Sequence, residues 1–142
     1  MLGAAASIID QKMIKKWQDR WINETKGRVH FNIQPLVSTR IKFCCKERGK
    51  ETTVSRLRLG KCFLNHYLHK ISLHPSGLCS QCDLPENIEH YIMRCSGNIE
   101  LILQLEKKCK KLGMDFTLKS ILNNDKLIDI LYAYIKAQKH RI

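Results

Sequence analysis

The chain of 142 residues carries 25 Lys and Arg against 13 Asp and Glu, a formal net charge of +12 at neutral pH. This length allows one domain with a modest core, and no stretch reaches the ~18 apolar residues needed to cross a bilayer. The start, MLGAAASIID, lacks the basic region of a secretory signal. We therefore expect an intracellular protein, nuclear or cytoplasmic, whose seven cysteines are mostly reduced.

The positive charge is concentrated in the first half of the chain. Residues 1–78 hold 15 Lys and Arg against five Asp and Glu, whereas residues 79–142 hold ten against eight. Because these cations are not confined to one face of an amphipathic helix, RNA or DNA is favoured over a membrane as the partner. Contacts to the nucleic-acid backbone should dominate, and no small-molecule substrate is expected.

A first helix is predicted from Ser7 to about Glu24. Its apolar residues follow helical spacing, and Ser7 with Asp10 resembles a capping box: Ile9, Met13, Ile14, Trp17 and Trp21. Its lysines either form a solvated face or contact nucleic acid. Gly27 suits the end of this helix.

Residues 29–33 alternate apolar and polar side chains, which favours a short strand or an extended lead-in before Pro35. Such a strand could pair with residues 42–45.

Residues 40–61 are the most basic part of the chain. Gly49 marks a loop, after which Thr52 or Thr53 could begin a helix that carries its apolar side chains inward: Val54, Leu57, Leu64, Leu68 and Ile71. Arg56 and Arg58 point to different sides of this helix, so at most one should contact a given phosphate row and the other should pair with an acidic neighbour. The residues expected to bind nucleic acid are Arg40, Lys42, Lys46, Arg48, Lys50, Arg56, Arg58 and Lys61.

The stretch from Leu78 to Gly97 contains the strongest motif, Cys-x2-Cys-x7-His-x4-Cys, formed by Cys79, Cys82, His90 and Cys95. Three thiolates and one imidazole suit a tetrahedral Zn²⁺ site, and a full set of four ligands indicates a structural rather than a catalytic metal. Asn87 should cap a short helix over residues 88–94. On a continuous α-helix His90 and Cys95 would lie ~140° apart, so the helix must tighten or end near Arg94.

The remaining cysteines, Cys44, Cys45, Cys62 and Cys109, are expected to be buried or idle thiols. Beyond Gly97, helices are predicted from Ile99 to Gly113, after a Thr117 cap, and from about Asn124; they should form the scaffold. Asp125 and Asp129 are interpreted as plain surface residues. The chain contains no GxxxxGK[ST], GxSxG or HExxH motif, so we expect no enzymatic activity.

Several blocks together resemble the C-terminal region of non-LTR retrotransposon polyproteins, downstream of the reverse transcriptase and, in some elements, of ribonuclease H. They are Trp17–Trp21 with Lys26–Arg28, Ser55–Gly60, Leu64–Ile71, Cys79-x-x-Cys82, Glu86-x-x-Glu89-His90 and Cys95. The resemblance implies a reverse-transcriptase zinc-binding module that acts on nucleic acid. It departs from the family at Lys61, often His, and at Ser96, often Pro; neither is a proposed ligand.

These observations predict a mainly α-helical fold, a small helical domain with one short extended segment and a Cys-Cys-His-Cys zinc staple. Residues 1–50 would form an N-terminal helix and basic arm, and residues 51–142 the zinc-binding domain, all within one compact unit. The expected function is a non-catalytic, zinc-binding nucleic-acid module. The alternatives are a module that docks on a reverse transcriptase domain and a decayed retrotransposon fragment without a selected role.

Overall fold

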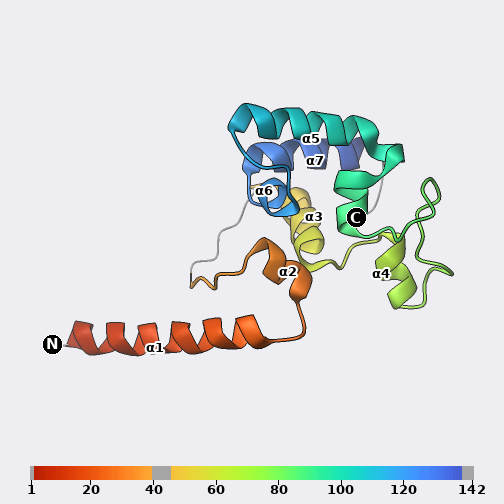
Figure 1. Ribbon diagram of the computed structural model, residues 1–142. Helices are drawn as coiled ribbons and strands as arrows, with labels where there is room; N and C mark the ends of the chain where they lie inside the picture. Colours follow the sequence, from red (N-terminus) through yellow and green to blue (C-terminus); the bar gives the residue numbers. More distant parts are fainter. Residues whose placement is uncertain (1, 40–45, 139–142) are drawn as a thin grey trace. The chain divides into compact units, whose positions relative to one another are not determined.

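The computed structural model describes residues 2–39 and 46–138 (Figure 1). By contacts within the chain it divides into two compact units, Met1–Lys42 and Phe43–Ile142, which are described separately. Across the described ranges helices predominate, and extended pairing is limited to one bridge between Leu78 and Pro85. The mainly α-helical class is therefore confirmed. The expected boundary between an N-terminal arm of residues 1–50 and a zinc-binding domain of residues 51–142 stays a prediction.

The first unit is built around Trp21, near the end of helix α1 (Leu2–Asn23). The indole ring packs against His30 and Phe31 of helix α2 (Arg28–Ile33), with ring centroids 6.0 and 5.7 Å away. Its Nε1 donates a hydrogen bond to the carbonyl oxygen of Gln34 at 3.1 Å. Trp21 thus joins α1, α2 and the segment that follows.

The expectation of an extended segment at residues 29–33 is wrong, since α2 is helical there. Successive side chains of a strand point to opposite faces, so a strand could not turn both His30 and Phe31 toward one indole. Burial against Trp21 outweighs the weak β propensity of this stretch. The expected partner strand at residues 42–45 lies outside the described residues.

The second unit contains helices α3 (Arg48–Leu59), α4 (Asn65–Lys70), α5 (Ile99–Leu112), α6 (Leu118–Leu122) and α7 (Asp125–Ala137). The sequence predicts a single helix from Thr52 to Ile71, and both of its ends are wrong. The observed helix α3 begins earlier, at Arg48, and ends before Gly60. Gly60 has a φ of 69°, a left-handed conformation that favours glycine. Val54 and Leu57 are buried as expected, but Ile71 is exposed.

The core of this unit lies where α5 runs alongside α7, with α6 and α3 packed on α7 (Figure 1). Its fully buried side chains include Leu57, Leu101, Leu105, Ile121, Leu122, Leu127 and Leu131. The helix ends expected beyond Gly97, at Gly113, Thr117 and Asn124, are confirmed. Thr117 Oγ1 accepts from Ser120 N at 3.1 Å, Asn124 Oδ1 accepts from Lys126 N at 3.0 Å, and Gly113 ends α5 with a φ of 65°.

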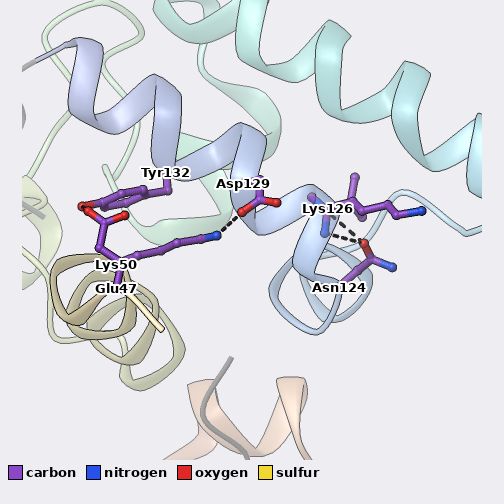
Figure 2. Close-up of polar contacts among 7 residues, drawn as sticks. Glu47, Lys50, Asn124, Lys126, Asp129 and Tyr132 are labelled. Atoms are coloured by element: carbon purple, nitrogen blue, oxygen red, sulfur yellow. Dashed lines mark hydrogen bonds and ion pairs between the residues drawn. The ribbon is translucent and has the colours of Figure 1, made fainter. Parts of the chain in front are cut away.

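Polar contacts fasten both ends of α3 to the C-terminal helices. Lys50 forms an ion pair with Asp129 of α7, and the Tyr132 hydroxyl donates to Glu47 Oε1 at 3.0 Å (Figure 2). At the other end, Arg58 Nε donates to the carbonyl oxygen of Leu122, the last residue of α6, at 3.1 Å. Asp129 is exposed, in agreement with its interpretation as a surface residue, and it also carries this ion pair, whose gain in stability is modest because one partner is exposed.

Candidate metal centre

A short hairpin brings Cys79 and Cys82 onto one tight turn. Leu78 bridges Pro85, and the N–H of Cys79 donates to the carbonyl oxygen of Leu84 at 2.8 Å. The turn closes when the N–H of Asp83 donates to the carbonyl oxygen of Cys79 at 3.0 Å. Asp83 has a φ of 53°, a left-handed conformation that Asp and Asn tolerate better than most residues. Both thiols are thereby held on the same side of the hairpin tip.

His90 and Cys95 are brought together by a wide helical turn. Residues His90–Arg94 form a π-helix, labelled η1, and the N–H of Cys95 donates to the carbonyl oxygen of His90 at 2.7 Å. Cys95 itself is extended, with φ −70° and ψ 122°. The helix ends after Arg94 as expected, but it widens rather than tightens. The hydrogen bond joins residues five positions apart, so Cys95 lies about one helical turn after His90.

The cap expected at Asn87 is also confirmed. Its Oδ1 accepts a hydrogen bond from the N–H of His90 at 2.8 Å. This bond fixes the start of the π turn at the residue that carries the imidazole. Asn87 therefore both begins the helix and positions His90, a candidate metal ligand.

The four side chains converge on one point, with all their ligand atoms within 4.8 Å of one another. The Sγ atoms of Cys79 and Cys95 lie 3.7 Å apart, and those of Cys82 and Cys95 lie 4.0 Å apart. These separations are far longer than the ~2.05 Å of a disulfide. They match the edge of about 3.8 Å expected in a tetrahedral site with metal–sulfur bonds of about 2.3 Å.

The chemistry of the cluster fits a bound cation. His90 is buried, and its Nε2 has no hydrogen-bond partner among the described residues, a costly state that a metal–nitrogen bond would relieve. Burial, with the neighbouring Cys79 thiol, raises the pKa of Cys95 to about 11. The Ser96 hydroxyl, 3.2 Å from Cys82 Sγ, lowers the pKa of the Cys82 thiol. A metal ion would replace the thiol protons and bind the thiolates.

Residues around the cluster connect it to α4. Glu86 Oε2 accepts from the N–H of Asn65 at 2.9 Å, and Asn65 Nδ2 donates to the carbonyl oxygen of Leu78 at 2.8 Å. Gly97 allows the hairpin to approach closely, because a Cβ there would lie 3.1 Å from Gln81 Cγ. The sequence analysis missed Asn65 and Glu86 as supports. Both lie in blocks that carry the family resemblance, Leu64–Ile71 and Glu86-x-x-Glu89-His90, and that was the signal that could have pointed to them.

The residues expected to bind nucleic acid differ in how exposed their side chains are. Lys46, Arg48, Arg56 and Lys61 are exposed, and the Arg56 guanidinium lies 5.5 Å from the ring centre of Phe63. Lys50 and Arg58 instead bond to α7 and α6, so Arg58 pairs with a helix carbonyl rather than with the acidic neighbour expected. Arg40 and Lys42 lie outside the described residues.

Cys62 and Cys109 are buried away from the cluster, in agreement with the expectation of apolar thiols. Burial raises the pKa of Cys62 to about 11, which makes it a poor nucleophile. Cys44 and Cys45 lie outside the described residues. Within the described ranges, every helix is too short or too polar to cross a membrane.

Among curated proteins, the chain is similar to the Retrovirus-related Pol polyprotein from type-1 retrotransposable element R1 2 of Nasonia vitripennis, with 33% identity over 91 residues. The match covers 63% of this chain and 21% of the polyprotein, so the chain spans a minor part of that relative. No protein-family model and no solved structure matches. The similarity supports a retrotransposon origin.

Proposed function

We propose that the chain is a zinc-stapled nucleic-acid-binding module from the Pol polyprotein of a non-LTR retrotransposon, with no catalytic role of its own. The observation that carries the metal site is the convergence of Cys79, Cys82, His90 and Cys95 within 4.8 Å. The relationship to a Pol polyprotein gives the context. The metal would fold the hairpin and the π turn against each other, and the bonds of Asn65 to Glu86 and Leu78 would then hold α4 against the hairpin.

Zinc is the metal that this donor set favours. Three sulfur atoms and one imidazole nitrogen suit a borderline-soft ion, whereas Ca²⁺ and Mg²⁺ prefer oxygen ligands. With four protein ligands the ion would have no open position for water, so its role would be structural. Cys79, Cys82, His90 and Cys95 would each supply one bond.

Nucleic-acid binding is supported by the charge of the chain and by cationic side chains that are exposed to solvent. A net charge of +12 attracts polyanions. Exposed cations lie on α3 and at both of its ends: Lys46, Arg48, Arg56 and Lys61. Side chains of this kind neutralise phosphates and release counterions, which gives tight binding at low salt with little sequence preference.

Two measurements test this proposal. Elemental analysis of the purified full-length chain should find about one zinc ion per molecule. Affinity for an RNA hairpin and for a DNA duplex, each measured at low and at moderate salt, should fall steeply as salt increases. A metal-free folded protein would refute the zinc site, and undetectable or salt-insensitive binding would refute the nucleic-acid role.

A second candidate function is docking on another segment of the polyprotein. Large apolar side chains are exposed in the metal hairpin, at Leu84 (53%), and in the segment of chain before it, at Leu73 (69%) and Phe63 (50%). The chain also spans only 21% of its relative, so other segments of such a polyprotein could cover them. A pull-down of the reverse transcriptase domain that persists at high salt would favour docking over phosphate binding.

A further inference from the structure

We propose that the first unit contains a stacking site for an unpaired nucleobase, with the indole ring of Trp17 as its platform. The inference rests on the proposed nucleic-acid function and assigns it a second contact, separate from the cations around α3. It would give this module a preference for single strands, which phosphate contacts alone do not provide.

The site is a cleft of about 160 Å³ formed entirely within the first unit. Its walls include Trp17, Trp21, His30, Gln34, Leu36 and Val37. Trp17 also borders a second hollow of about 150 Å³, which it shares with Trp21, Arg20 and Glu24. The Trp17 side chain is 49% exposed. A flat aromatic surface therefore lies accessible between two adjoining hollows.

Hydrogen bonds hold the walls of the cleft in place. Gln18, next to Trp17, donates through Nε2 to the carbonyl oxygen of Pro35 at 2.9 Å and accepts through Oε1 from the N–H of Val37 at 2.9 Å. Trp21 is fixed by its own bond to Gln34 and by its contacts with α2. The segment after α2 is thus fastened along α1, and the cleft is formed before any ligand arrives.

Size and charge together favour a nucleobase as the occupant. At about 160 Å³ the cleft is smaller than the pockets of about 300–1,000 Å³ that enclose whole small molecules, so its volume suits one ring of a larger ligand. Arg20 borders the second hollow, and further cations of α1 precede Trp17: Lys12, Lys15 and Lys16. Glu24 is the acidic residue in the lining of that hollow. A cation beside an exposed indole, on a helix with further lysines, matches a negatively charged backbone that carries aromatic bases.

The ligand should be single-stranded. The bases of a duplex are already stacked on one another and are not free to lie on a side chain, whereas every unpaired base offers a π face. Stacking on Trp17 should therefore act on single strands alone, while the cations of α3 act on single strands and duplexes alike. A comparison of single-strand with duplex affinity therefore separates stacking on Trp17 from phosphate contacts of the α3 cations.

The test uses the full chain with zinc, a short single-stranded oligothymidylate and a DNA duplex of equal length. Trp17→Ala should weaken binding of the single strand about tenfold, and Trp17→Phe should restore most of the affinity. Duplex affinity should stay unchanged in both variants. Ile22→Ala, which truncates another half-exposed apolar side chain of α1, is the matched control and should bind like the wild type.

Fluorescence supplies an independent readout, since a stacked base quenches indole emission and Trp17→Phe should remove most of the quenching. Circular dichroism and zinc content confirm that each variant is folded. Unchanged single-strand affinity in Trp17→Ala would overturn the stacking site, leave the nucleic-acid function standing and make the cleft a surface for a protein partner. Failure of the wild type to bind either oligonucleotide at low salt would overturn both.

Discussion

Cys95 donates its backbone N–H to the carbonyl oxygen of His90 at 2.7 Å, so two candidate metal ligands lie across one turn of a π-helix. An α-helix at the same residues would separate them by ~140°. The widened turn is therefore the local structure on which the cluster depends. Its stability rests on the Asn87 cap at one end and on the extended Cys95 at the other.

Loss of the Asn87 cap should loosen the metal site more than it loosens the fold. Asn87→Ala removes the acceptor for His90 N–H, which should cost about 1 kcal/mol of stability and weaken zinc affinity about tenfold. Chelator competition measures the affinity, and thermal melting measures the stability. Asn124→Ala, which removes the cap of α7, is the control: it should lower stability similarly and leave zinc affinity unchanged (Figure 2). Equal affinity losses would contradict a positioning role for Asn87.

Replacing a ligand should remove the metal and unfold the hairpin together. Cys79→Ser is expected to reduce zinc from about one ion per chain to almost none, with a loss of helical signal, because metal binding contributes to folding. Cys109→Ser makes the same chemical change at a buried thiol outside the cluster and should keep its zinc. If Cys79→Ser melts at the wild-type temperature, the metal is not a structural element.

Replacing Arg56 should affect nucleic-acid binding, whereas replacing Arg58 should affect the stability of the fold. Arg58→Ala leaves the carbonyl oxygen of Leu122 without its partner, which should cost about 1–3 kcal/mol of stability. Arg56 is exposed, so Arg56→Ala should weaken nucleic-acid binding with little change in the free energy of unfolding. Urea unfolding and filter binding of both variants measure the two quantities. The reverse pattern would show that the phosphate contact lies at Arg58.

The salt dependence of nucleic-acid affinity should show how many cations contact phosphates. Replacing Lys46, Arg48, Arg56 and Lys61 together by Gln should reduce the slope of log affinity against log salt by about three. The control replaces four lysines of α5, Lys107, Lys108, Lys110 and Lys111, by Gln and makes the same change in charge. An equal reduction in the control would mean that binding follows net charge and is not localised around α3.

Spacing and capping chemistry predicted the parts of this fold that depend on neighbours in sequence. The caps at Asn87, Thr117 and Asn124 and the convergence of the Cys-x2-Cys pair with the later His and Cys followed from local rules. The helix at Arg28–Ile33 did not, because its conformation is decided by contact with Trp21, which lies outside the window of residues 29–33. The roles of Lys50 and Arg58 were hidden for the same reason: their partners lie far along the chain, at Asp129 and Leu122.

The closeness of the four candidate ligands in sequence has a consequence for the order of folding. All of them lie between Cys79 and Cys95, so closing the site requires a small loss of chain entropy and no residue of α5, α6 or α7. Local contacts of this kind form early. During synthesis of the chain, the hairpin and the π turn would therefore be able to bind a metal ion before the C-terminal helices emerge, and those helices would then pack on a segment already folded.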